Sequence, residues 1–208
     1  LAPSTVNRRL AAVRSLVALA RTLGMVGWVL DVKGVRSQSY KDTKGPGKAG
    51  VRKLLADVSK RSDKKGIRDQ GIFACLTDLA LRRAEVCRLD LEDLDTSAGT
   101  LAILGKGRLE KERVSLPGPT LDALAEWVTT RGDAPGPLFT NMDRAKKGNG
   151  RLCGESIYYL VRRMGKAVGL KVRPHGLRHA SVSEALTQTR GNVADVKSFS
   201  RHVNVATV

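Results

Sequence analysis

The chain is poor in the residues that build disulfide frameworks, zinc sites and membrane spans. It has three cysteines in 208 residues, an odd number without a CxxC spacing, which argues against a disulfide framework and a structural zinc site. No apolar run approaches the ~20 residues that a membrane-spanning helix needs, and no charged leader precedes a short apolar segment. We therefore expect a soluble, cytoplasmic protein that makes no contact with membranes and uses its cysteines as small apolar side chains.

Acidic residues are also scarce relative to basic ones. The chain carries 20 Asp and Glu against 37 Lys and Arg, which gives a net charge of +17. Such a surplus favours a polyanionic partner, and nucleic acid is the most economical one. A merely basic surface, such as a ribosome-associated protein carries, is the alternative, and binding to a membrane surface is a weaker one.

The sequence divides into two unequal parts joined by a linker. Residues 4–23 place apolar side chains at helical spacing with arginines off that stripe, which predicts a basic amphipathic helix that begins at a Ser4 or Thr5 cap. We assign residues 1–31 to this helical part, residues 32–48 to a basic, glycine-containing linker, and residues 49–208 to one globular domain with its own core.

Within the globular domain the pattern predicts mostly helices with a small antiparallel sheet, so the expected fold class is α+β, mainly α. Two β-prone runs, 100–104 and 113–116, flank a glycine- and lysine-rich stretch and predict a β-hairpin with a long basic tip. The remaining predicted elements are helices at 51–58, 71–89 and 119–129, a loop at 135–150, a helix capped by Ser156, and helical structure with short breaks from 174 onward.

Five basic and imidazole side chains form the candidate active site: Arg82, Lys106, His175, Arg178 and His202. Two arginines, one lysine and two histidines without a carboxylate pair predict a pocket for a phosphate. The planar guanidinium offers two donors to one phosphate and stays charged, whereas a lysine between two glycines can donate a proton from a flexible stem. His175 and Arg178 lie three residues apart, so they share a helix face.

A metal site is the rival interpretation of the histidines, because His175 and His179 lie four residues apart. We reject it, since the usual acidic partner is absent from this motif and Arg178 would repel a cation. We therefore expect no metal and no cofactor, and we expect His179 to be a packed, hydrogen-bonded helix residue.

Four segments carry a resemblance to a known family. They are Leu81-Arg82-Arg83-Ala84-Glu85, Gly105-Lys106-Gly107, Pro174-His175-Gly176-Leu177-Arg178-His179 and Ser200-Arg201-His202. In order, spacing and wording they resemble the catalytic domain of tyrosine recombinases, the phage integrase family. The resemblance covers residues 49–208, and residues 1–31 are similar to the last helical part of that family's core-binding domain.

The resemblance implies a role for each matching residue. Arg82 and Arg178 would clamp the scissile phosphate, Lys106 would protonate the leaving 5′ oxygen, His175 would act as acid or base, and His202 would donate to a nonbridging oxygen. The matching acidic position implies that Glu85 orients Arg82. The expected DNA contacts are Arg108, Lys111, Arg113 and Arg201.

The sequence departs from the family pattern at Ala80 and Arg201, where many members have glycine. The family's nucleophilic tyrosine follows the last histidine by about nine residues, whereas this chain continues for six residues after His202, to Val208. None of Tyr40, Tyr158 and Tyr159 matches, so we expect the nucleophile beyond Val208, removed, or supplied by a neighbouring protomer. Without it, the chain should not form a phosphotyrosyl bond in cis.

The expected function is that of a site-specific DNA recombinase or integrase that cleaves and rejoins DNA through a 3′-phosphotyrosyl intermediate. The implied partners are double-stranded DNA and further copies of the chain, a dimer on one site and a tetramer in synapsis, on the nucleoid of a bacterial or phage-infected cell. Two alternatives stay open: an enzyme like a type IB topoisomerase, and a catalytically silent DNA-binding relative.

Overall fold

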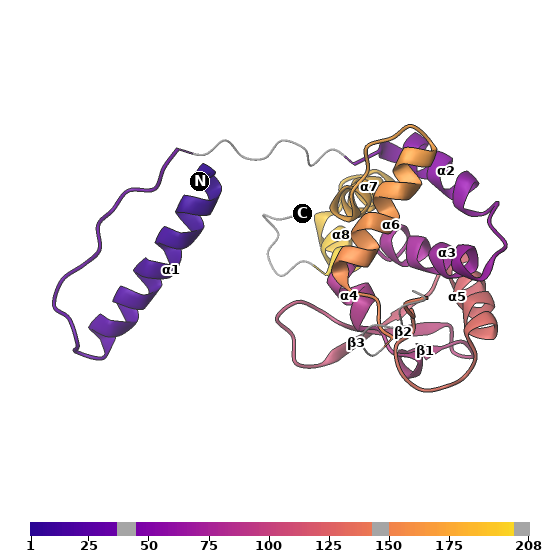
Figure 1. The fold of residues 1–208 in the computed structure, drawn as a ribbon, viewed down its shortest axis with the longest axis horizontal. Helices are drawn as coiled ribbons and strands as arrows, with labels where there is room; N and C mark the ends of the chain where they lie inside the picture. The colour runs from indigo at the N-terminus through magenta and orange to yellow at the C-terminus, as the bar shows by residue number, and fades with distance from the viewer. Residues whose placement is uncertain (37–44, 143–149, 202–208) are drawn as a thin grey trace. The chain divides into compact units, whose positions relative to one another are not determined.

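The computed structural model describes residues 1–36, 45–142 and 150–201 (Figure 1). It divides the chain into two compact units, Leu1–Lys41 and Asp42–Val208. Within the described residues, no helix combines the length and the apolar character needed to cross a membrane.

The first unit is a helix with a returning segment. The predicted helix is confirmed as α1 (Pro3–Thr22), but its start differs from the prediction, because Ala2 is the N-cap and Pro3 occupies the first turn in place of a Ser4 or Thr5 cap. The Asn7 side chain donates to the carbonyl of Val35 and accepts from its N–H, both at 2.8 Å. This pair holds the end of the segment against the first half of α1, as the ribbon shows (Figure 1).

The second unit is mainly helical with one small sheet, which agrees with the expected fold class. Its elements follow in chain order: α2 (Gly47–Val58), α3 (Lys64–Thr77), α4 (Arg83–Arg88), the 3₁₀ turn η1 (Leu91–Asp93), β1 (Leu94–Asp95), β2 (Thr100–Leu104), β3 (Lys111–Ser115), α5 (Gly118–Arg131), α6 (Gly154–Ala167), α7 (Pro174–Gln188) and α8 (Val193–Ser200).

The sheet has three antiparallel strands in the order β1-β2-β3. Thr100 pairs with Ser115 and Leu104 with Lys111, so the predicted hairpin is confirmed with its basic connection intact. The central strand β2 buries Leu101, Ala102 and Ile103, while β3 alternates between exposed and half-buried positions, as a strand with one solvated face does. The two-residue strand β1 was not predicted, because it is too short to show a period of its own.

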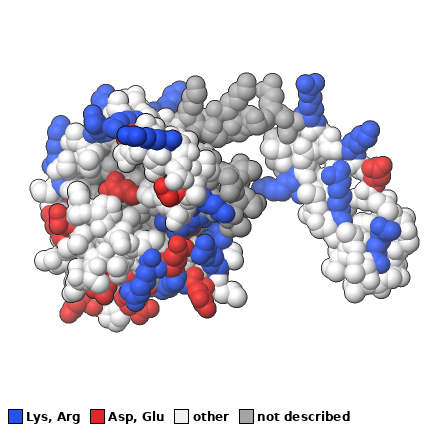
Figure 2. Space-filling model, turned by 180° about the vertical axis from the view of Figure 1, so that it is seen from behind, with Lys and Arg blue, Asp and Glu red and all other residues white. Residues whose placement is uncertain are grey.

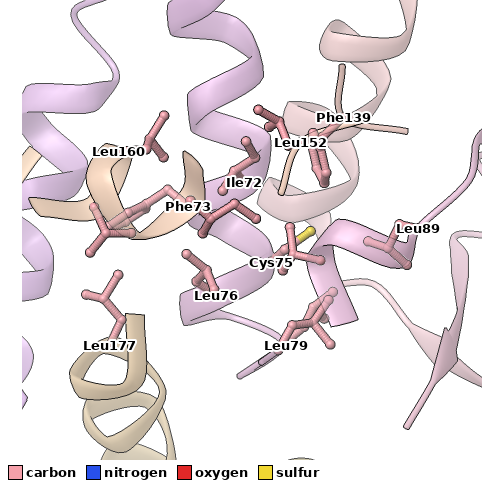
Figure 3. Packing of buried hydrophobic residues seen from close by; sticks show 14 of the residues in the cluster. Ile72, Phe73, Cys75, Leu76, Leu79, Leu89, Phe139, Leu152, Leu160 and Leu177 are labelled. Atoms are coloured by element: carbon pink, nitrogen blue, oxygen red, sulfur yellow. The ribbon is translucent and has the colours of Figure 1, made fainter. Parts of the chain in front are cut away.

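Helix α3 lies at the centre of the core. Ile72, Cys75 and Leu76 are fully buried, and Leu160 of α6 and Leu177 of α7 lie in the same cluster (Figure 3). Because α3 is apolar on nearly every side in its second half, it can pack against α5 and α7 at the same time. This central position means that α3 carries the turn that follows it, where the candidate site begins.

The predicted single helix at 71–89 is wrong, because the structure breaks it into α3 and α4. Ala80 adopts a left-handed backbone conformation with φ of 47°, which no helix continues. A capping box then begins the next helix: the Glu85 carboxylate accepts a hydrogen bond from the N–H of Arg82, and Arg82 is the N-cap of α4. The break therefore places Arg82 at a helix start, outside the regular helical pattern.

The predicted helix at 119–129 and the helical structure after residue 174 are confirmed as α5, α7 and α8. The helix predicted at Ser156 is also confirmed, as α6, but Ser156 is not its cap, since the helix begins at Gly154 with Cys153 as N-cap. Part of the predicted loop at 135–150 and all residues from His202 lie outside the described residues.

Candidate active site: a cationic pocket at the starts of α4 and α7

Four of the five predicted catalytic residues line one pocket of about 490 Å³: Arg82, Lys106, His175 and Arg178. They come from the start of α4, the β2–β3 connection and the first turns of α7, so segments far apart in the sequence supply them. Leu81, Arg83, Ala84, Tyr158, Arg173 and Pro174 complete the lining. The fifth residue, His202, lies outside the described residues.

The basic surplus is unevenly distributed between the two units. On the face that Figure 2 shows, Lys and Arg predominate on the first unit, whereas the second unit carries both signs of charge. Within the second unit, cations gather locally at the pocket, where an anion can bind.

Glu85 and Arg82 form a buried ion pair at one wall of the pocket. The Glu85 carboxylate is 3% exposed and accepts from the Arg82 backbone N–H at 2.8 Å and from Arg82 Nη1 at 2.7 Å. A carboxylate held by both groups fixes the direction of the arginine side chain. This contact supports the prediction that Glu85 orients Arg82.

Arg178 lies deeper than Arg82 and connects three elements. Its guanidinium donates to the backbone carbonyls of Ala80, in the turn after α3, and Ser200, at the end of α8. Burial, with repulsion from Arg82, lowers the pKa of Arg178 to about 10, so the side chain remains charged at neutral pH. A fixed, desolvated cation of this kind is suited to stabilise charge that develops on a phosphate.

The two departures from the family's glycine pattern occupy left-handed backbone conformations. Ala80 has φ of 47° and Arg201 has φ of 52°, which is the region where glycine is favoured. The Ala80 side chain is fully buried in a small cluster with Val182 and Val196, so the contacts of its methyl group oppose the backbone strain.

Arg201 is buried, and its guanidinium is engaged by the protein. It donates to the carbonyl of Leu79 at 2.8 Å and of Phe199 at 3.2 Å, and Glu85 lies 4.0 Å away. Its side chain is only 4% exposed, which favours an internal role over the predicted contact with DNA. The geometry joins the end of α8 to the turn that precedes Arg82.

His175 stands at the start of α7 and contacts His179 one turn later. The two Nε2 atoms are 2.8 Å apart, and the rings meet edge to face with centroids 4.3 Å apart. Burial lowers the pKa of His175, with further contributions from the neighbouring His179 imidazole and from the cations Arg178 and Arg82, and burial and Arg178 lower the pKa of His179. Both imidazoles are therefore neutral at pH 7, as a proton acceptor must be.

Lys106 is exposed at the turn between β2 and β3, where Gly107 has φ of 77°. Two of the predicted DNA contacts beside it have carboxylate partners. Arg108 pairs with Glu112 at 3.0 Å, and Lys111 pairs with Asp93 at 2.5 Å, a hydrogen bond that raises the pKa of Lys111.

The third predicted contact on this hairpin, Arg113, is an exposed residue of β3 opposite Ala102. Arg113 and Lys106 are therefore exposed cations on the hairpin. Arg108 and Lys111 would have to give up their ion pairs with Glu112 and Asp93 before they could bind a phosphate.

Sequence reasoning missed some residues around the site. Tyr158 and Arg173 line the pocket. Arg173 directly precedes the Pro174-His175 motif, and this adjacency was the available signal. Tyr158 gave none, because its helix was predicted to pack against the core and the pocket forms only in the folded chain. Tyr159 beside it is 65% exposed.

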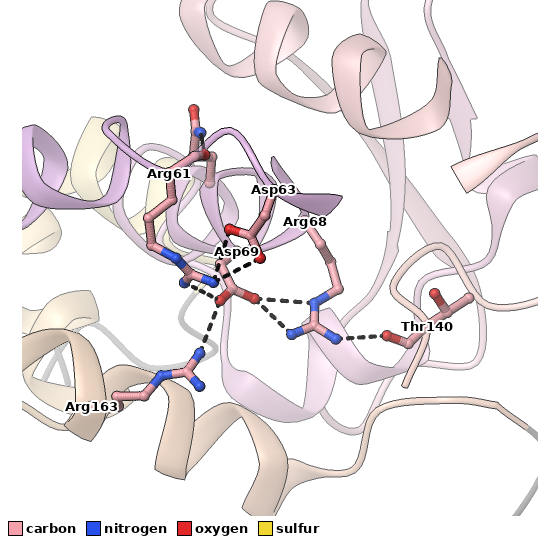
Figure 4. A network of polar contacts seen from close by, with 7 residues as sticks. Arg61, Asp63, Arg68, Asp69, Thr140 and Arg163 are labelled. Carbon is pink, nitrogen blue, oxygen red and sulfur yellow. Dashed lines mark hydrogen bonds and ion pairs between the residues drawn. The ribbon is translucent and has the colours of Figure 1, made fainter. Parts of the chain in front are cut away.

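A second charged cluster supports the fold away from the pocket. Asp69 is fully buried and binds three arginines: Arg61 at 2.8 Å, Arg68 at 2.7 Å and Arg163 at 3.1 Å (Figure 4). Arg68 also donates to the carbonyl of Thr140 at 2.9 Å. The cluster therefore ties α3 to α6 and to the segment after α5, and sequence reasoning missed it because Arg163 and Thr140, which complete it, are distant from Asp69 in the chain.

Another hollow of about 530 Å³ lies between α2, α7 and α8. It is lined by two basic residues, Lys48 and Arg52, of which Lys48 is paired with Glu184 at 2.5 Å, and its lining also includes Asp78 and Asp195. This hollow lacks the convergent cations of the first pocket. Among the described residues, His, Cys, Asp and Glu nowhere form a group of three or more that could hold a metal ion.

The fold and the pocket define a class: a mainly helical domain that gathers arginine, lysine and histidine around one pocket. The chain belongs to the phage integrase family, whose model matches residues 48–208. It is 38% identical over its whole length to a tyrosine recombinase of Synechocystis sp. and 40% identical to one of Synechococcus elongatus. It spans 67% and 66% of those two proteins.

Solved structures share the fold at lower identity. The XerH site-specific recombinase, in a post-cleavage complex with a palindromic difH substrate, matches the whole chain with a TM-score of 0.76 at 20% identity, over 63% of that protein. The Tn1549 transposon integrase in complex with transposon right end DNA matches it with a TM-score of 0.77 at 14% identity, over 74% of that chain.

Proposed function

We propose that this chain is the catalytic part of a site-specific DNA recombinase or integrase that cleaves and rejoins DNA through a 3′-phosphotyrosyl intermediate. The observation that carries the proposal is the convergence of Arg82, Lys106, His175 and Arg178 on one pocket. Family membership and the two cyanobacterial tyrosine recombinases support it.

The chemistry follows from the charges around the phosphate. Attack by a tyrosine oxygen on phosphorus puts additional negative charge on the nonbridging oxygens, and Arg82 and Arg178 would stabilise that charge as fixed cations. His175 would accept the tyrosine proton, and Lys106 would give a proton to the departing 5′ oxygen. One phosphodiester bond replaces another, so rejoining is the same step in reverse.

His202 would add a donor to a nonbridging oxygen, and the nucleophile would be the tyrosine that the family places after it. The position of Ser200 supports this role for the residues that follow it, because the Ser200 carbonyl accepts a hydrogen bond from Arg178, which lines the pocket. A chain that leaves α8 at this point starts next to the phosphate site.

We further propose that the first unit is the end of a core-binding domain and that both units hold duplex DNA. Leu16 and Leu19 on α1 and Leu23 at its C-cap are each more than half exposed, which is typical of a helix that packs against further helices. Arg8 and Arg9 of the same helix are exposed cations suited to the phosphate backbone.

Assembly on DNA, as a dimer on one site and a tetramer in synapsis, is part of the same proposal, as is residence with the nucleoid. The solved relatives XerH and the Tn1549 integrase were captured on DNA, which supports duplex DNA as the partner. Binding should weaken steeply with salt, because each phosphate contact releases counterions.

A covalent trapping assay tests the function. The full-length protein is incubated with duplexes selected from a random pool by binding, each nicked near the cleavage point so that the short product diffuses away. We expect a protein–DNA adduct stable in detergent. Arg82→Ala, Lys106→Ala and Arg178→Ala should abolish it while binding persists, and Arg88→Ala, an exposed cation on the same helix as Arg82, should not.

Other outcomes identify the alternatives. Relaxation of any supercoiled plasmid by a monomer would indicate a topoisomerase. Salt-sensitive binding without an adduct, in a protein that has the tyrosine, would indicate a silent DNA-binding relative and contradict the proposal.

A further inference from the structure

The side chains of His175 and His179 form a hydrogen bond along one face of α7. The Nε2 atoms are 2.8 Å apart, and the ring planes are inclined by 82°. Two imidazole nitrogens at that distance share one proton, since one must donate and the other accept. The pair therefore behaves as one unit whose Nε2 atoms face each other.

With Nε2 paired to His179, Nδ1 is the remaining ring nitrogen of His175, a residue that lines the pocket. If His175 donates through Nε2, its Nδ1 is a bare acceptor. If His179 donates instead, Nδ1 of His175 carries the proton. When Nδ1 of His175 takes up a proton and the shared proton passes to His179, His175 stays neutral, carries its proton at Nδ1 and can later act as an acid there, without any movement of the rings.

The charges around the pair oppose a stable imidazolium. Arg82 on α4, Lys106 on the hairpin, and Arg173 and Arg178 at the start of α7 line the pocket, and Tyr158 faces it from α6. Glu85 already binds Arg82 at 2.7 Å. Arg201 at the end of α8 adds a further cation, 4.0 Å from Glu85.

A proton taken by His175 alone would therefore lie beside two guanidinium groups. His179 is one turn further along α7, where Arg178 is the charged neighbour that lowers its pKa. Moving the charge to His179 takes it away from Arg82, which lowers the pKa of His175 but is not among the causes for His179.

We propose that His179 is a positioning residue that fixes the His175 ring and takes over its proton during the reaction. His175 Nδ1 accepts the proton of the attacking hydroxyl, and the Nε2 proton of His175 passes to Nε2 of His179. The reverse transfer returns a proton when the strand is rejoined, so the count of protons is unchanged over the cycle. The predicted effect of His179 on the reaction rate rests on the proposed function, whereas the pairing of the two histidines does not.

Nuclear magnetic resonance tests the pairing without any DNA. The ring signals of His175 and His179 can be assigned by substitution in uniformly labelled full-length protein. We expect His175 and His179 to titrate as a coupled pair with two separated steps. In His179→Phe, His175 should titrate in one step at higher pH, because a neighbouring positive charge is gone. A His175 curve that is the same in wild type and His179→Phe would overturn the pairing.

The covalent trapping assay tests the role. We expect His179→Phe to lower the rate of adduct formation about 10- to 100-fold, within the range for loss of acid–base assistance, and to change the shape of its pH profile. His179→Gln, whose amide can still hold His175 Nε2, should recover part of the rate but not the wild-type pH profile. Ser183→Ala, on an exposed position of α7, is the matched control and should change neither.

The outcomes separate the two proposals. A wild-type protein that pairs its histidines but forms no adduct contradicts the proposed function, and the transfer role falls with it. An active protein in which His179→Phe keeps the wild-type rate and pH profile overturns the role of His179 alone. Thermal melts of each variant show whether a lost rate comes from lost fold.

Discussion

Replacing Glu85 by glutamine tests whether the negative charge of this carboxylate stabilises the arginines in and beside the pocket. Glu85→Gln keeps the shape and one carbonyl oxygen, so the bond to the Arg82 N–H can survive. It removes the charge that faces Arg82 at 2.7 Å and Arg201 at 4.0 Å. Both guanidinium groups would then lack their carboxylate while Arg178 remains buried nearby.

The size of the effect follows from burial. Removing one partner of a buried ion pair costs about 3–5 kcal/mol, because the other charge stays desolvated. The Arg82 side chain is 28% exposed, so water recovers part of that cost, and we expect the free energy of unfolding to fall by about 2–4 kcal/mol. This is a large share of the ~5–15 kcal/mol that stabilises a typical domain.

Denaturant unfolding followed by tryptophan fluorescence measures this loss. Trp127 is fully buried and donates to the Leu138 carbonyl, so it reports on the second unit, and Trp28→Phe removes the exposed second signal. Glu155→Gln is the control, since Glu155 faces Arg83 at 3.3 Å and is 64% exposed. We expect the control to change stability by less than ~0.5 kcal/mol. Equal effects of both substitutions would refute the reasoning.

Two further predictions concern the start of α7. The pKa values of His175 and His179 are lowered in the folded state, so the unfolded chain binds more protons than the folded chain below pH ~6.5. The free energy of unfolding should therefore fall as the pH drops from 7 towards 5. His175→Gln should flatten this pH dependence in thermal melts recorded at a series of pH values. A steeper dependence in the variant would contradict the sign. A Cβ at Gly45 would lie 2.0 Å from the Gly176 carbonyl oxygen, so Gly45→Ala should displace this turn and slow adduct formation at least about tenfold, whereas Gly118→Ala, with open space, should not. An unchanged rate in Gly45→Ala would show that the turn does not set the geometry.

The fold was predictable where the pattern is local. The β-prone runs at 100–104 and 113–116 predicted the hairpin, and the helical pattern around Ser156 predicted α6. The break between α3 and α4 was not, because its stabilising bonds are long-range. The carbonyls of Leu79 and Ala80 accept from Arg201 and Arg178, which lie 122 and 98 residues away in sequence.

The candidate site divides in the same way. The order of the motifs along the chain was enough to group Arg82, Lys106, His175 and Arg178, and the pocket contains all four. The burial of Arg201 could not be read from the sequence, since a basic residue in a basic chain suggests a surface contact. The left-handed backbone at Ala80 and Arg201 had one signal in the sequence. Both residues stand where the family resemblance leads one to expect glycine, the residue that adopts this conformation most easily.

The central claim is that this pocket holds the scissile phosphate. The most direct measurement is a structure of the full-length protein on a selected DNA site. The account predicts one phosphate inside the pocket, with its nonbridging oxygens within hydrogen-bond distance of the Arg82 and Arg178 guanidinium groups and with Lys106 close to the 5′ oxygen. A complex in which DNA crosses another face and the pocket contains no phosphate would contradict it.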